Sequence, residues 1–165
     1  MQKMNIKVLE IIIQKLQSQK QQNSRVQEKD RAVLRKMLKD FYASPAVAIH
    51  CSDEIVEKNL DAAIGPNPQL QGVVFEEDGR IVGYALMTSC YNTEFGGQCV
   101  WLEELCIEPE WQSHGLGTAF FDWVRQQYPD AVRFRLEAEP DNERAVALYR
   151  RWGFHPSPYL QMNYE

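Results

Sequence analysis

The most constraining stretch of this sequence is a glycine-containing turn between an apolar run and an amphipathic run. The apolar run covers residues 100–107, the turn covers residues 112–117, and the amphipathic run covers residues 118–126. Glycines at a strand-to-helix turn let the backbone approach a ligand closely, and the first N–H groups of a helix can hold an anion. The sequence therefore predicts a phosphate-binding turn at this position.

Two common kinds of phosphate turn do not fit. The dinucleotide-binding turn needs a small residue three positions after the second glycine, where this chain has Phe120, and the ATP-type loop needs a following Lys-Ser/Thr pair, which is missing. A Gly-x-Gly turn alone also closes many ordinary bends. The interpretation therefore depends on a second motif further along the chain.

That second motif is a short helical pattern over residues 140–154. Asp141 or Asn142 is expected to cap the helix, Val146 and Tyr149 share one helical face with Trp152, and Gly153 ends the helix in a left-handed conformation. It lies downstream of the first motif and is unrelated to it in pattern. A chain that carries both motifs in this order is unlikely to match a known pattern by chance.

Together the two motifs resemble those of the GNAT superfamily of acyl-CoA-dependent N-acetyltransferases. That family has a Gln/Arg-x-x-Gly-x-Gly/Ala turn followed by an Asn-x-x-Ala-x-x-x-Tyr-x-x-x-Gly-Phe helix, and the second pattern fits at Asn142, Ala145, Tyr149, Gly153 and Phe154. The resemblance implies an α/β (α+β) fold of the GNAT type: a mixed, mostly antiparallel central sheet with helices on both faces.

We expect a single acetyltransferase domain over residues 1–165. Residues 1–22 carry an amphipathic stripe from Ile6 to Leu16, and either residues 6–13 supply the family's first strand or residues 1–22 form an N-terminal helical extension, because residues 24–28 are polar for a strand. Further elements follow from spacing and turn signals. They are a helix over 33–41 capped by Asp30, a helix over 55–64 capped by Ser52, a hairpin of 72–76 and 80–89 around residues 77–79, strands at 98–107 and 132–137, and a last strand at 159–164.

Composition excludes several classes of function. The net charge is −5, from 18 Lys and Arg against 23 Asp and Glu, which disfavours a nucleic-acid partner. No run approaches the ~20 apolar residues of a membrane span, and the N-terminus lacks a secretory signal pattern, so we expect a cytoplasmic protein with no membrane partner. The four cysteines lack metal-ligand spacing, so we predict no metal site. The Ile6 to Leu16 stripe and the last strand are candidate surfaces of a homodimer.

Amine acetylation needs a base, because an alkyl amine with a pKa near ~10.4 is almost fully protonated at neutral pH. Glu103 and Glu104 stand in an apolar strand, where carboxylates are rarely placed without a role. Adjacent strand residues face opposite sides, so the two carboxylates share a site only if a bulge intervenes. The segment also resembles the acidic strand of the polyamine-acetylating branch of the family, which implies Glu103 as base or relay and Glu104 as its companion or substitute.

The family resemblance implies the remaining site residues. Tyr149 is the expected general acid that protonates the departing sulfur of coenzyme A. Because no Lys or Arg occurs between Ile81 and Val124, backbone N–H groups are expected to hold the pyrophosphate, with Arg150 or Arg151 as candidates for the outer phosphates. The expected acetyl-CoA-binding residues are Leu105, Cys106, Ile107, Gln112, Ser113, His114, Gly115, Leu116, Gly117, Thr118, Asn142 and Tyr149.

The predicted function is transfer of the acetyl group of acetyl-CoA to a primary amine of a small cationic acceptor, by direct attack in a ternary complex. Phe41, Tyr42, Tyr91, Glu94 and Trp101 are plausible walls of an aromatic and acidic amine pocket. Two alternatives stay open. One is acetylation of a protein or peptide amine, and the other is a catalytically silent acyl-CoA-binding regulatory module.

Overall fold

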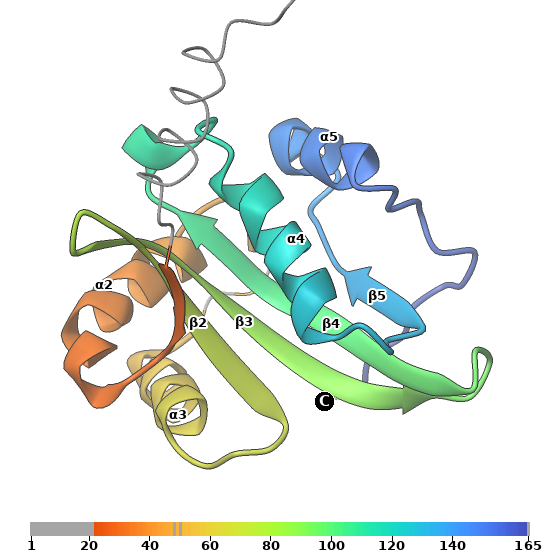
Figure 1. The fold of residues 1–165 in the computed structure, drawn as a ribbon, viewed down its shortest axis with the longest axis horizontal. Coiled ribbons are helices and arrows are strands. Elements are labelled where there is room, and N and C mark those ends of the chain that lie inside the picture. Colours follow the sequence, from red (N-terminus) through yellow and green to blue (C-terminus); the bar gives the residue numbers. More distant parts are fainter. Residues whose placement is uncertain (1–21, 48, 50, 165) are drawn as a thin grey trace, which may run out of the picture.

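The fold is built around one twisted sheet, seen in a computed structural model that describes residues 22–47, 49 and 51–164. No described helix is long and apolar enough to cross a lipid bilayer. Figure 1 shows the elements in chain order. They are β1 (Gln22–Arg25), the 3-10 turn η1 (Glu28–Asp30), α2 (Arg31–Tyr42), α3 (Asp53–Ile64), β2 (Leu70–Glu77), β3 (Arg80–Asn92), β4 (Gly97–Ile107), the 3-10 turn η2 (Pro109–Trp111), α4 (Leu116–Gln127), β5 (Arg133–Leu136) and α5 (Glu143–Arg151).

The described strands form a five-stranded sheet in the order β1-β2-β3-β4-β5. Each neighbouring pair is antiparallel except β4 and β5, which are parallel. The β4–β5 pairing covers only four residues and ends where Leu102 faces Leu136, while β4 continues to Ile107. On its β5 side, the last part of β4 therefore has no strand partner among the described residues, as the short β5 arrow in Figure 1 shows.

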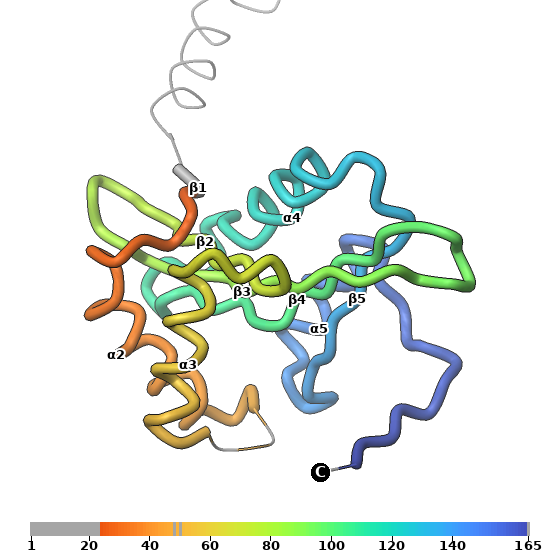
Figure 2. The backbone as a smooth tube through the Cα atoms, turned by 90° about the horizontal axis from the view of Figure 1, so that it is seen from below, coloured from red at the N-terminus to blue at the C-terminus, as the bar shows by residue number. Residues whose placement is uncertain are grey.

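Helices cover both faces of the sheet, which confirms the predicted fold class. Figure 2 shows the sheet edge-on, with α4 on one side and α2 and α3 on the other. The core is accordingly divided into two clusters. One joins Val73, Phe75, Val100 and other strand residues to Phe120 of α4, and the second joins alternate strand residues such as Tyr84 to α2 and α3. Successive side chains along each strand thus point to opposite faces of the sheet and pack in the two clusters in turn.

Several local signals in the sequence are confirmed. The hairpin between β2 and β3 turns at Asp78 and Gly79, both at positive φ, as a two-residue hairpin turn requires. The Ser52 hydroxyl accepts the Ile55 N–H and caps α3. At the start of α2, Asp30 has a different role from the predicted cap: its carboxylate accepts the Gln27 N–H at 2.9 Å and so closes η1.

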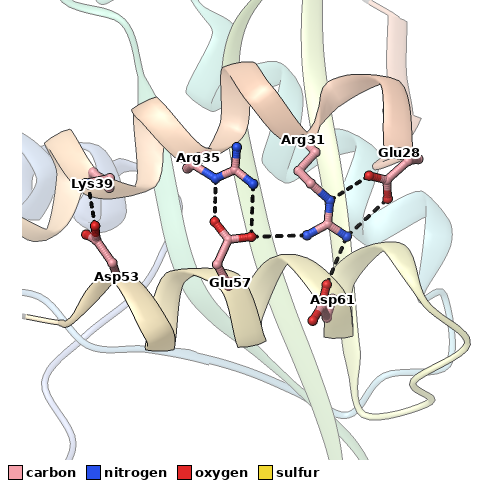
Figure 3. A network of polar contacts seen from close by, with 7 residues as sticks. All are labelled: Glu28, Arg31, Arg35, Lys39, Asp53, Glu57 and Asp61. Carbon is pink, nitrogen blue, oxygen red and sulfur yellow. Dashed lines mark hydrogen bonds and ion pairs between the residues drawn. The ribbon is translucent and has the colours of Figure 1, made fainter.

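A network of ion pairs joins α2 to α3 across the layer (Figure 3). Arg31 contacts Glu28 and Asp61 at 2.7 and 2.9 Å, Arg35 pairs with Glu57, and Lys39 pairs with Asp53 at 2.8 Å. Pairs this exposed contribute little stability individually, because solvent screens them. Their effect is to fix how the two helices lie against each other.

Two expectations about the ends of the chain are wrong. The first described strand is β1, whose last two residues, Ser24 and Arg25, belong to the segment expected to be too polar for a strand. It lies at the edge of the sheet and, among the described strands, pairs only with β2, so backbone hydrogen bonds rather than apolar side chains hold it. Residues 159–164, expected to be a strand, have no strand structure and are exposed. The predicted Ile6 to Leu16 stripe lies outside the described residues.

Candidate active site

A cavity of about 880 Å³ opens where β4 ends and α4 begins. Its walls come from α2, the end of β4, the turn before α4, and α5. It brings together all the predicted cofactor residues except His114. These are Leu105, Cys106, Ile107, Gln112, Ser113, Gly115, Leu116, Gly117, Thr118, Asn142 and Tyr149.

The two glycines of the turn have different structural roles. Gly115 has φ 88°, a left-handed conformation that favours glycine, and it is the N-cap of α4, whose first residues Leu116, Gly117 and Thr118 line the cavity. Gly117 is at the contact between α4 and α5, where an added Cβ would lie 2.9 Å from Leu148 Cδ2. The second glycine therefore also serves close helix packing, which the sequence prediction did not include.

Arg144, in the first turn of α5, supplies the positive charge that residues 81–124 lack. Its guanidinium donates to Gln112 Oε1 at 2.5 Å and to Ser113 Oγ at 2.9 Å. The Gln112 amide in turn donates to the Ile107 carbonyl oxygen at 2.7 Å, which ties the turn to the end of β4. Sequence reasoning considered Arg150 and Arg151 instead, of which Arg151 lines the cavity and Arg150 does not. Arg144 stands two residues after the capping Asn142, and this position in the second motif could have indicated a cation beside the turn.

A bulge in β4 determines toward which face of the sheet the side chains of Glu103 and Glu104 point. Glu104 pairs with Leu86 and Leu102 pairs with Met87, so Glu103 is the extra residue between them. A bulge of this kind changes the alternation of side chains. Glu103 accepts a hydrogen bond from Thr88 and Glu104 accepts one from Tyr84, two residues that β3 presents on the α2–α3 side. Both carboxylates consequently lie on the same face of the sheet.

The environments of the two carboxylates differ. Glu103 is exposed, whereas Glu104 is half-buried and accepts hydrogen bonds from the hydroxyls of Tyr42 and of Tyr84, the latter at 2.7 Å. Asn59 of α3 donates to the Tyr42 hydroxyl at 2.8 Å. Burial raises the pKa of the Glu104 carboxyl, and these tyrosine hydrogen bonds oppose the rise. Neither glutamate lines the cavity, although Leu105, the next residue, does.

Tyr149 lines the cavity from α5, with its ring edge-on to Phe121 and Phe154. The structure shows no hydrogen bond from its hydroxyl to another described residue. Burial raises the pKa of the Tyr149 phenol. The phenol therefore stays protonated at neutral pH and is available as a proton donor. Asn142 begins the same helix and caps it, its side chain accepting the Ala145 N–H at 3.2 Å.

The one cysteine of the cavity wall is not a competent nucleophile. Burial raises the pKa of the Cys106 thiol to about 12, and the nearby Glu104 adds to this effect. Since the thiolate is the reactive form, the thiol at this position is inert at neutral pH. Among the described residues, no group of three His, Cys, Asp or Glu side chains is placed to hold a metal ion.

Some side chains lie differently from the prediction. The His114 ring is outside the cavity wall and stands next to that of Trp111, with centroids 6.3 Å apart. Of the plausible amine-pocket walls, Phe41 lines the cavity and Tyr91 is exposed. Three carboxylates that were not predicted as site residues also line the cavity. They are Asp40, which pairs with Lys36 at 2.6 Å, and Glu108 and Glu110, which both pair with Arg80.

Comparison with known proteins identifies the family. Residues 33–154 match the family model described as the Acetyltransferase (GNAT) family. This match covers most of the chain, so the protein belongs to the GNAT acetyltransferases, and the sequence-based recognition of the superfamily is confirmed.

Curated relatives and solved structures are similar to the chain, among them a putative ribosomal protein bS18-alanine N-acetyltransferase of Bacillus subtilis (strain 168), 27% identical over 100 residues, which are 59% of this chain and 62% of that protein. The thialysine N-epsilon-acetyltransferase of Sus scrofa is 30% identical over 111 residues, which are 61% of this chain and 65% of that protein, so the match spans less than two thirds of the relative. A crystal structure described as a possible acetyltransferase from Clostridium difficile 630 has a TM-score of 0.74 at 16% identity, over 87% of this chain and 96% of that one.

Two further structures share the fold at 12% identity, each over 87% of this chain. One is an aminoglycoside N-acetyltransferase in complex with CoA, with a TM-score of 0.71 and 93% of its own chain covered. The other is a ribosomal-protein-alanine N-acetyltransferase from Brucella melitensis biovar Abortus 2308, with a TM-score of 0.68 and 99% covered. At this identity these structures establish the fold only.

Proposed function

We propose that this chain is a single acetyltransferase domain that transfers the acetyl group of acetyl-CoA to the primary amine of a small acceptor. The observation that carries the proposal is the free edge of β4. Among the described residues, no strand pairs with residues 103–107 on their β5 side, and this segment runs from the two glutamates along the cavity toward the turn at the start of α4.

The residues present fit the cofactor. An extended pantetheine arm can hydrogen-bond to a free strand edge as an added strand does. The pyrophosphate fits the N-terminus of α4, where free N–H groups and the helix dipole favour an anion, and Arg144 adds a charged donor beside Ser113. Asn142 would contact the arm from the other side of the cavity.

The thioester supplies an activated acetyl group, so the protein has to move protons and hold the reactants. We assign Glu103 as the base, because it is exposed and, among the described residues, accepts a hydrogen bond only from the Thr88 hydroxyl, whereas both oxygens of Glu104 already accept tyrosine hydroxyls. Glu103 takes one proton from the ammonium, the nitrogen bonds to the acetyl carbon as the carbon–sulfur bond breaks, and Tyr149 gives its proton to the sulfur. The second amine proton restores the phenol through solvent, so one proton is released per turnover.

The proposal includes two finer points: the chain belongs to the polyamine-acetylating branch of the family, and its acceptor is a small cation. The acidic pair on one face of the sheet supports them, since carboxylates attract a cation. The relative from Sus scrofa is named for an amine of thialysine, which agrees with a small acceptor. The relative from Bacillus subtilis is named for an alanine of a ribosomal protein, which favours the alternative of a protein amine. Homodimer formation also remains a proposal.

Replacing Tyr149 with Phe tests the proposal. With saturating acetyl-CoA and a panel of diamines, polyamines, aminoglycosides and peptides with free amino termini, Tyr149→Phe should lower kcat about 100-fold or more on every active acceptor. Acetyl-CoA affinity, measured by calorimetry, should change less than about twofold. Acetyl-CoA binding by the wild type without turnover on any amine would instead indicate a silent binding module.

A further inference from the structure

Arg135 is a half-buried cation on the same face of the sheet as the two glutamates. It faces Trp101 across the parallel β4–β5 pair, and its guanidinium carbon lies 4.6 Å from the centroid of the Trp101 ring. Trp101 in turn faces Thr88 of β3, whose hydroxyl donates to Glu103. Directly paired residues present their side chains to the same side of a sheet. Thr88, Trp101 and Arg135 thus form one row across three strands, with Glu103 beside it.

Arg135 has no carboxylate partner among the residues that the structure describes. The charge of Arg135 acts on Glu94, but the oxygens of Glu94 accept hydrogen bonds from Tyr159 and, at 3.1 Å, from Arg133. These two hydrogen bonds hold the pKa of Glu94 below its usual value, and the charge of Arg135 adds only a smaller effect. Stacking on Trp101 leaves the edge of the Arg135 guanidinium, where its N–H donors lie, available to another group.

We propose that the acceptor carries a carboxylate as well as the reacting amine, and that Arg135 binds this carboxylate beside Trp101. The inference rests on the proposed acetyl transfer and narrows its substrate class to amino acids with a side-chain amine. Glu103 holds the ammonium end and Arg135 holds the anionic end, so the row is complementary to a zwitterion. A diamine would place its second ammonium next to the Arg135 guanidinium, where like charges repel.

Pairs of acceptors that differ only in the carboxylate test this inference. L-Lysine is compared with cadaverine, and L-ornithine with putrescine, for the wild type, Arg135→Gln, Arg135→Lys and the control Arg125→Gln, a change in α4. The wild type should prefer the amino acid in each pair. Arg135→Gln should lower kcat/KM for the amino acids roughly 10- to 100-fold and should leave it unchanged or raise it for the diamines, because the like-charge repulsion is removed. Arg135→Lys should keep part of the preference, because it keeps the charge.

Direct binding separates the inference from the proposed function. Calorimetric titration of the acetyl-CoA-free protein with each acceptor should show tighter binding of L-lysine than of cadaverine, and loss of the difference in Arg135→Gln. If no amine is acetylated, the proposed function fails, and these titrations still decide the inference. Preference of the wild type for diamines, or equal losses on both members of a pair in Arg135→Gln, would overturn it.

Discussion

At the scale of single residues, the bulge at Glu103 distinguishes two neighbouring carboxylates. One is exposed with a threonine hydroxyl beside it, and the other is enclosed by Tyr42 and Tyr84. We expect Glu103→Gln to lower kcat roughly 10²- to 10⁴-fold, which is the usual effect of removing a general base from an enzyme. Glu104→Gln should cost less, because the amide oxygen can still accept one tyrosine hydroxyl. Steady-state kinetics at saturating acetyl-CoA would measure both, and a larger loss in Glu104→Gln would reverse the assignment.

Arg144 is the second residue whose role can be isolated. Arg144→Gln should raise KM for acetyl-CoA roughly tenfold with little change in kcat, since a charge-assisted hydrogen bond to phosphate is lost. Arg150→Gln is the matched control, because Arg150 is on the same helix and outside the cavity wall. The comparison is made by initial rates at several salt concentrations. An equal KM for Arg144→Gln and Arg150→Gln would remove Arg144 from cofactor binding.

At the scale of elements, the position of β4 depends on close packing at Gly83 of β3. A Cβ added there would lie 2.6 Å from Phe75 Cδ2 and 2.7 Å from the Cys106 carbonyl oxygen. Gly83→Ala should therefore destabilise the fold by about 1–3 kcal/mol, as overpacking of a core does. Thermal unfolding measures the change against Ser89→Ala, an exposed position of the same strand. A melting temperature within the range of that control would contradict the packing argument.

The same scale shows how far the sequence predicts the structure. The hairpin at Asp78 and Gly79, the caps at Ser52 and Asn142, and the left-handed Gly153 are predictable, because each depends on residues within a few positions. β1 is not, because its pairing partner β2 lies far along the chain. The two motifs predict the sides of the cavity formed by the turn and by α5, but not the side formed by α2. The bulge at Glu103 and the contact of Arg144 with Gln112 depend on the register between elements, which spacing does not determine.

At the scale of the whole molecule, the half-buried Glu104 makes the stability of the fold depend on pH. Its pKa is raised in the folded state, so the folded protein binds the proton more tightly than the unfolded chain. The stability from this group is fully present below the unfolded pKa and is lost as pH rises through the folded pKa. Glu104→Gln removes this dependence, so its melting temperature relative to the wild type should increase from pH 4 to pH 8. A constant difference across that range would contradict the linkage.

The free edge of β4 has a consequence for the protein before it binds its cofactor. Unpaired N–H and C=O groups along a strand are a template on which another polypeptide can form a strand, and proteins generally shield them. Among the described residues, no strand pairs with residues 103–107 on the β5 side, and of their polar groups the Ile107 carbonyl already accepts the Gln112 amide. The protein without acetyl-CoA would then be more prone to aggregation than the protein with acetyl-CoA bound, because the bound molecule would cover the unpaired edge of β4.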